Sequence, residues 1–142
     1  MIPTKVFISH SSLDRVFTDS LVKVLLRHGI PVWYSPVNIL VAQEWHNEIG
    51  QALDGCDWFL VVLSPNATKH PKESRWWVKH EVIHAINEAR LEGRLIPVLH
   101  QPCEKKTLSF ILPQIQHIDF QADFEQGCRN LLRIWELDYQ PE

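Results

Sequence analysis

Residues 5–10 read KVFISH, a short run in which three apolar residues are followed by two polar ones. A continuous apolar run of this length, without polar alternation, is typical of a strand buried on both faces in a parallel sheet. Residues 11–14 follow directly and read SSLD, a serine followed three residues later by an acid, which is a helix-capping pattern. The sequence therefore predicts a buried strand that passes almost directly into a helix.

The same alternation continues along the whole sequence. Apolar residues at helical spacing predict a helix that ends before Gly29, and its expected core positions are Leu13, Val16, Phe17, Leu21, Val24 and Leu25. Further strands are predicted at residues 32–34, 57–63, 95–99 and 115–118. Further helices are predicted at residues 44–53, 75–91 and 123–137, with loops at 35–43 and 64–74 and a stop at Gly93. Five strands alternating with helices predict an α/β fold, a doubly wound five-stranded parallel sheet with helices on both faces.

Length and composition fit one domain. The 142 residues are expected to form a single unit over residues 1–142, with a core from about 4 to 137. A net charge of −3 argues against a main role in nucleic-acid binding, which needs surplus positive charge. No apolar run is long enough to span a bilayer, and the N-terminus lacks a secretory pattern. The odd number and wide spacing of the cysteines suit a reducing cytoplasm, namely Cys56, Cys103 and Cys128.

Several familiar ligand motifs are missing from the sequence. No G-x-G-x-x-G follows the first strand, and there is neither a phosphate-binding G-K-[ST] nor a hydrolase G-x-S-x-G. The first strand ends in Ser9 and His10, which argues against the acidic cluster of a phospho-receiver. Ligands of doubly wound sheets bind outside the carboxyl ends of the strands. These ends are expected at Ser9-His10, Tyr34-Ser35, Leu63-Ser64 and Leu99-His100.

Residues 80–84 read HEVIH and match the H-E-x-x-H pattern of zinc proteases. At about 100° per residue, His80 and His84 lie nearly opposite the apolar stripe that must face the sheet, formed by Val78, Val82, Ala85, Ile86 and Ala89. Glu104, the candidate third ligand, falls in the loop after the next strand. Two solvated histidines are therefore the preferred interpretation, and no metal site is predicted.

Trp77 and Glu81 are four residues apart and share a helix face that flanks the apolar stripe. Their helix starts near the carboxyl edge of the sheet. There the indole could stack on a flat ring, and the carboxylate could accept from ribose hydroxyls or stabilise a developing positive charge. Spacing alone favours the plainer interpretation, a tryptophan that covers the core beside a solvated glutamate.

Four stretches, in order, resemble the sequence boxes of TIR (Toll/interleukin-1 receptor) domains. Residues 5–14 (KVFISHSSLD) resemble the first box, and residues 29–34 (GIPVWY) the entry to the second. Residues 59–65 (FLVVLSP) resemble the third-strand segment. Residues 77–81 (WVKHE) are similar to the W-x-x-x-E of the NAD⁺-cleaving, bacterial TIR branch. Each box is weak alone, but four in the family's order are specific.

The resemblance implies a flavodoxin-like fold and an NAD⁺ glycohydrolase that releases nicotinamide and ADP-ribose or a cyclic ADP-ribose. It implies Glu81 as the catalytic residue, NAD⁺ as substrate rather than cofactor, and no metal. It places Phe7, Ser9, His10 and Trp77 at the nicotinamide pocket, although Phe7 fits the core equally well and His10 fits a loop histidine. Activity would depend on self-association of TIR domains and would serve defence against phage or stress signalling.

The second-box loop departs from the family pattern. Ser35 and Ala42 stand where an aspartate and a glycine are usual, and the intervening apolar residues could self-associate or pack back on the domain, namely Val37, Ile39, Leu40 and Val41. Because this loop contributes to TIR–TIR contacts, the assembly geometry stays open. Two other functions also stay open: a non-catalytic TIR interaction module, and a zinc hydrolase resting on His80 and His84.

Overall fold

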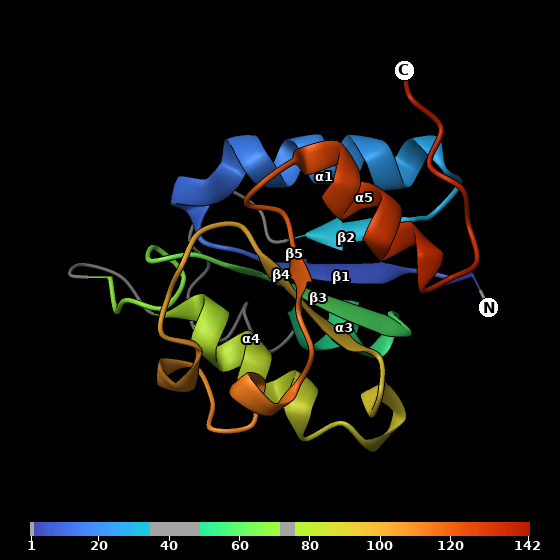
Figure 1. The fold of residues 1–142 in the computed structure, drawn as a ribbon. Helices are drawn as coiled ribbons and strands as arrows, with labels where there is room; N and C mark the ends of the chain where they lie inside the picture. Colours follow the sequence, from blue (N-terminus) through green and yellow to red (C-terminus); the bar gives the residue numbers. More distant parts are fainter. Residues whose placement is uncertain (1, 35–48, 72–75) are drawn as a thin grey trace.

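A computed structural model describes residues 2–34, 49–71 and 76–142. Its strands form one sheet in the order β2-β1-β3-β4-β5, and every neighbouring pair is parallel (Figure 1). They are β1 (Val6–Ser9), β2 (Val32–Tyr34), β3 (Trp58–Leu63), β4 (Leu95–Leu99) and β5 (Ile118–Asp119). This order is that of a flavodoxin-like sheet, whose strand order reverses between β1 and β3. The predicted fold class is confirmed.

Helices cover both faces of the sheet (Figure 1). One face carries α1 (Arg15–Arg27), which follows the 3-10 turn η1 (Ser12–Asp14), and α5 (Phe124–Arg133). The other carries α3 (Gly50–Asp54) and α4 (Trp77–Ile86). Shorter 3-10 turns are η3 (Ala89–Leu91), η4 (Lys105–Thr107) and η5 (Leu112–Gln114). Within the described ranges, no helix has the length and apolar character needed to cross a membrane.

Two hydrophobic clusters, one on each face, hold the layers together. Side chains alternate along β1, so Val6 and Ile8 pack with α1 and α5 while Phe7 packs with α3 and α4. All four residues of β1 are buried, which explains why the strand reads as a continuous run rather than an alternating one. The sheet edge where Ser9 ends β1 is therefore fixed from both sides.

Two helices end earlier than their apolar spacing predicts. The helix expected over 75–91 ends at Ile86 and is followed by η3, although Gly93 does mark a stop, with a φ of 76°. The helix expected over 123–137 ends at Arg133 because the chain turns at Glu136, whose φ is 59°. The N–H of Leu137 then bonds to the carbonyl of Leu132, as in a Schellman cap.

The fifth strand and the start of the first helix also differ from the prediction. The strand expected over 115–118 is only Ile118–Asp119, because the chain before it forms η5. Leu13 and Val16, expected in the core, are 77% and 84% exposed, because the buried face of this segment runs through Asp14, Thr18 and Leu21 instead. Of the helix expected over 44–53, only the end is described, as α3. The predicted loop at 35–43, including Ser35 and Ala42, lies outside the described residues.

Candidate functional site

The side chains of Ser9 and Glu81 meet at the carboxyl end of β1. The hydroxyl of Ser9, the last residue of the strand, donates to Oε1 of Glu81 over 2.6 Å. Ser9 has no exposed surface and Glu81 is 1% exposed. A buried carboxyl group is costly unless it is hydrogen-bonded, and this contact offsets part of that cost.

Glu81 reaches this position through α4, the helix that follows the loop leaving β3. Val78, Val82 and Ala85 form the buried stripe, as predicted, but Glu81 is buried with them rather than at the solvated flank. The sheet order reverses between β1 and β3, and ligands of doubly wound sheets bind at this switch point, outside the carboxyl ends of the strands. The carboxylate therefore lies where this fold places its ligand sites.

Trp77 and Phe7 take different places around this pair. Trp77 begins α4, one turn before Glu81, and is half-buried, with its ring centroid 6.2 Å from that of His80. Phe7 is fully buried and stacks between Trp33 at 4.7 Å and Phe59 at 5.3 Å. Trp77 as a substrate contact stays a prediction. So does Phe7, although its position favours the core interpretation made for it.

His10 points to the opposite face of the sheet from Ser9, as the alternation of a strand requires. Its Nε2 lies 3.4 Å from Nη1 of Arg15, and its ring centroid is 5.9 Å from that of Tyr34. Burial, and to a smaller extent the nearby Arg15 guanidinium, lower the pKa of His10 to about 4. His10 is therefore neutral at pH 7, and the structure does not bring it together with Glu81.

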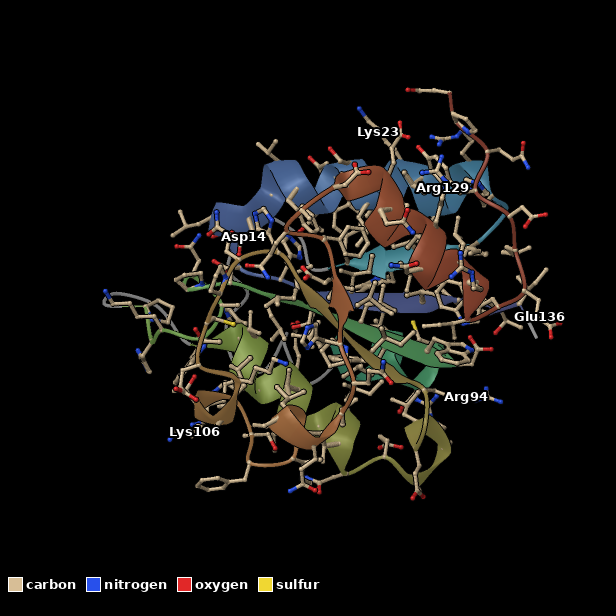
Figure 2. The ribbon with its side chains drawn as sticks, in the orientation of Figure 1. Asp14, Lys23, Arg94, Lys106, Arg129 and Glu136 are labelled. Atoms are coloured by element: carbon tan, nitrogen blue, oxygen red, sulfur yellow. The ribbon has the colours of Figure 1, made fainter. Side chains whose placement is uncertain are left out.

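A second buried carboxylate, which the sequence analysis did not single out, lies on the α1 face of the same edge. Asp14 is 5% exposed; its carboxylate accepts from the hydroxyl of Ser64 and, over 2.9 Å, from the amide of Asn66. Figure 2 shows Asp14 at the end of the molecule opposite Arg94. The available signals were Asp14 in the capping pattern and Ser64 at a strand end. In the structure, Ser11 makes the capping contact, by accepting from the N–H of Leu13.

The loop from β3 into α4 is tied down by further hydrogen bonds. The N–H of Ala67 donates to the hydroxyl of Ser64 over 3.1 Å, and the indole of Trp76 donates to the carbonyl of Ala67 over 2.9 Å. The hydroxyl of Thr107 donates to the carbonyl of Thr68 over 2.9 Å. The described part of this loop is thereby joined to the Asp14 cluster.

The H-E-x-x-H histidines do not form a shared site. His80 is exposed and His84 is half-buried. Among the described residues, one cluster has ligand atoms close enough to hold a metal. It consists of Asp54, His84 and Glu88, whose ligand atoms lie within 4.8 Å of one another. This trio includes neither His80 nor the candidate third ligand of the sequence analysis.

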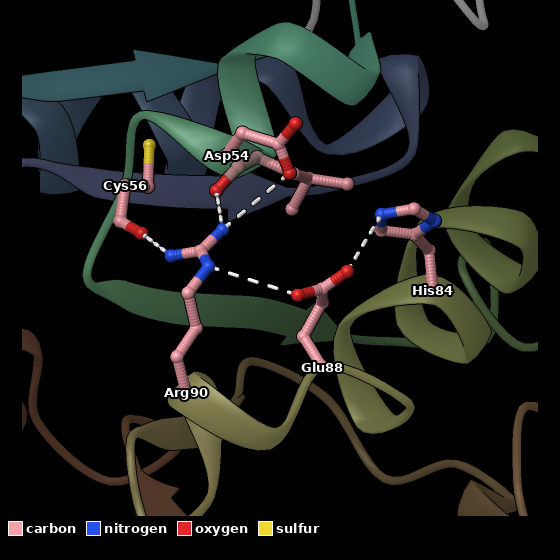
Figure 3. Close-up of polar contacts among 6 residues, drawn as sticks. Asp54, Cys56, His84, Glu88 and Arg90 are labelled. Atoms are coloured by element: carbon pink, nitrogen blue, oxygen red, sulfur yellow. Dashed lines mark hydrogen bonds and ion pairs between the residues drawn. The ribbon is translucent and has the colours of Figure 1, made fainter.

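Arg90 already pairs with both carboxylates of that trio (Figure 3). Its guanidinium lies 3.8 Å from Asp54 and 3.7 Å from Glu88 and donates to the carbonyls of Leu53 and Cys56. Nε2 of His84 lies 3.6 Å from Glu88. A cation placed there would be repelled by the guanidinium, so the cluster is best described as an arginine-centred link between α3 and η3.

A family model described as a TIR domain matches residues 6–132, and the chain belongs to the TIR domain family. The fold is similar to the crystal structure of the TIR domain of the Toll-related receptor TRR-2 from Hydra magnipapillata. That match has a TM-score of 0.68 and 23% identity, over 91% of this chain and 95% of the other. It is also similar to the TIR domains of the activated Roq1 resistosome that recognises the pathogen effector XopQ. There the TM-score is 0.67 and the identity 16%, over 93% and 99% of the two chains. No curated protein matches the chain.

Proposed function

We propose that this TIR domain cleaves NAD⁺ between nicotinamide and ribose, with Glu81 as the catalytic residue. The observation that carries the proposal is the buried carboxylate of Glu81, held by Ser9 at the switch point of the sheet. The W-x-x-x-E spacing of Trp77 and Glu81, which resembles the NAD⁺-cleaving branch of the family, supports it further. NAD⁺ is the substrate, and no additional cofactor is proposed.

A single carboxylate suits this reaction. When the bond between nicotinamide and ribose breaks, its electron pair moves to the positively charged ring nitrogen, so nicotinamide leaves neutral and needs no proton. The ribose that remains has oxocarbenium character, the type of charge that carboxylates stabilise in glycoside hydrolysis. Addition of water then gives ADP-ribose and a proton, whereas attack by a nucleophile within the same molecule gives a cyclic ADP-ribose.

The burial of the Glu81 carboxylate supports a dependence of activity on assembly. Because Glu81 is 1% exposed, NAD⁺ reaches it only after neighbouring side chains move. We propose that association with other TIR domains supplies this rearrangement, as part of defence or stress signalling. The similarity to TIR domains of an activated resistosome that recognises a pathogen effector is consistent with such a role.

The second candidate is a non-catalytic TIR interaction module. Burial and an internal hydrogen bond are also what a structural carboxylate would show, and this observation favours the alternative. Leu13 and Val16 add exposed apolar surface at the start of the α1 region, which a partner domain could cover. Under this alternative, Glu81 contributes to stability and not to chemistry.

NAD⁺ consumption at high protein concentration, with and without a crowding agent, separates the candidates. The wild-type chain is compared with Glu81→Gln, which keeps the shape and an oxygen acceptor for Ser9, and thermal melting establishes that both are folded. Turnover that disappears in the variant supports the proposal. Turnover that survives contradicts the role of Glu81, and the absence of turnover under every condition favours the interaction module. Loss of activity with a chelator would instead support the zinc hydrolase.

A further inference from the structure

The hydroxyl of Ser9 is committed to Glu81 in this structure. The 2.6 Å from its Oγ to Oε1 falls in the range of hydroxyl groups that donate to an ionised carboxylate. Both side chains are buried, so the bond is shielded from competing water. A hydroxyl has one proton to donate, and here that proton is directed at the carboxylate.

The position of Ser9 makes it a rigid donor. It ends β1, which pairs with β2 on one side and with β3 on the other, where Ser9 is in register with Val61. Two residues earlier on the same face, Phe7 is stacked between two aromatic rings. The serine side chain has a single torsion before its hydroxyl, whereas a glutamate side chain has three. The strand therefore limits the rotation of the longer, more flexible group.

We infer that Ser9 is a positioning residue that orients the carboxylate of Glu81 and favours its charged form, rather than the substrate contact that its place in the sequence suggests. The inference rests on the proposed function, since that is what gives Glu81 its catalytic role. A hydroxyl that donates to a carboxylate stabilises the ionised form over the protonated one. The charged form is the one that can stabilise an oxocarbenium ribose.

Among the described residues, the other titratable groups of α4 are Lys79, His80 and His84, and Arg90 of η3 is engaged with the carboxylates of the α3 link. The strands present apolar residues to this face, namely Phe7, Phe59, Val61 and Leu63. His10 faces the other side, toward Arg15. Ser9 is the strand residue that donates to Glu81, so its removal should change the pKa of Glu81.

The kinetic test compares Ser9→Ala with Ser9→Thr, which keeps a hydroxyl and suits a strand. Ser64→Ala is the matched control, because Ser64 follows the neighbouring strand and also donates to a buried carboxylate, but on the opposite face. We expect Ser9→Ala to lower kcat for NAD⁺ by about ten-fold to a hundred-fold while KM stays within about two-fold. Ser9→Thr should recover most of kcat, and Ser64→Ala should leave it unchanged. A rise in KM at constant kcat would overturn the inference in favour of substrate binding.

A second measurement does not depend on turnover. The carboxyl group of Glu81 is titrated by carbon-13 NMR in each variant, and its signal is assigned by its loss in Glu81→Gln. We expect Ser9→Ala to raise the pKa of Glu81 by about one unit and Ser64→Ala to leave it unchanged. An unchanged pKa in Ser9→Ala would overturn the positioning role whatever the turnover. A raised pKa in a protein that leaves NAD⁺ intact would support the Ser9 contact and contradict the proposed function instead.

Discussion

Two buried carboxylates lie at the same edge of the sheet, on opposite faces, and each accepts from a serine at the end of a strand. Glu81 on α4 accepts from Ser9 after β1, and Asp14 before α1 accepts from Ser64 after β3. Asp14 also accepts from the amide of Asn66, and the N–H of Ala67 donates to the Ser64 hydroxyl. These hydrogen bonds connect the start of α1 to the loop that follows β3. Burial alone therefore does not identify a catalytic carboxylate, because both groups are almost fully enclosed.

What separates the two is their surroundings. The hydrogen bonds of Asp14 fix the start of one helix against the loop that precedes another, which is a structural task. Glu81 lies one turn from the half-buried indole of Trp77 and faces the switch point from the side of α4. Under the proposed function, the α1 face serves stability and the α4 face serves chemistry, and the variants below test that division.

The largest effect on stability is expected for Asp14→Ala. This change leaves the buried donor of Ser64 and the half-buried donor of Asn66 without their acceptor. At about 2 kcal/mol for the buried group and about 1 kcal/mol for the half-buried one, the free energy of unfolding should fall by about 3 kcal/mol, as measured by urea denaturation. Turnover per folded molecule should change little. A loss of NAD⁺ cleavage in the folded variant would break the division between the two faces.

The pH dependence of stability is expected to come from the α1 face through His10. Its pKa is lowered from 6.5 to about 4 in the folded state, so the unfolded chain binds more protons between these values. The contribution of His10 to the free energy of unfolding should be fully present above about pH 6.5. It should fall by roughly 3 kcal/mol as the pH drops toward 4.

His10→Gln should remove most of this pH dependence, as followed by urea denaturation at pH 7 and at pH 4.5. It should leave KM for NAD⁺ unchanged at pH 7.5, because the ring faces Arg15 and not Glu81. A clear rise in KM would show that His10 belongs to the substrate site after all.

Gly127→Ala provides a control that weakens the α1 and α5 face without touching either carboxylate. A Cβ at this position would lie 2.4 Å from Cδ2 of Phe120, so the ring or the helix must shift. We expect a loss of about 2 kcal/mol in the free energy of unfolding, despite the higher helix propensity of alanine. If NAD⁺ turnover below the melting temperature fell as it does in Glu81→Gln, the assay would be reporting stability rather than chemistry.

The smallest effect is expected for Glu136→Gly, at the end of the molecule away from the carboxyl edge (Figure 2). Glu136 has a φ of 59° in the turn that ends α5, a conformation that glycine adopts without strain. The variant should be stabilised by about 0.5 to 1 kcal/mol, seen as a small rise in Tm, with unchanged turnover. A destabilised variant would mean that the Glu136 side chain makes a contact worth more than the strain.

Much of the fold follows from local patterns in the sequence. Continuous apolar runs predicted β1, β3 and β4 to within about a residue, because a strand buried on both faces has no polar positions. The run at residues 32–34 also predicted β2, although this edge strand is half-buried. The fifth strand was placed too early because it pairs over two residues only, at the sheet edge, where little burial constrains the sequence. Leu13 and Val16 fit the helical spacing but lie off the buried face, which runs through Asp14 and Thr18.

The site is less accessible to sequence reasoning. Helical spacing placed Trp77 and Glu81 on one face, which is a local property, but it could not show that Glu81 is buried. The hydrogen bond that accompanies this burial comes from Ser9, which is 72 residues away along the chain. The same limit applies to Asp14 and Ser64, which are 50 residues apart. Ser9 and His10 are adjacent in sequence, yet their side chains face opposite sides of the sheet, so the predicted pocket residues divide between two clusters.

The most direct test compares NAD⁺ consumption by the wild-type chain, Glu81→Gln and Asp14→Asn under conditions of self-association, at a temperature where all three are folded. Each variant replaces a buried carboxylate by its amide, on one face or the other. We predict that Glu81→Gln lowers turnover by on the order of 100- to 1000-fold, while Asp14→Asn stays within a few-fold of wild type. Equal losses in both variants, or full activity in Glu81→Gln, would contradict it.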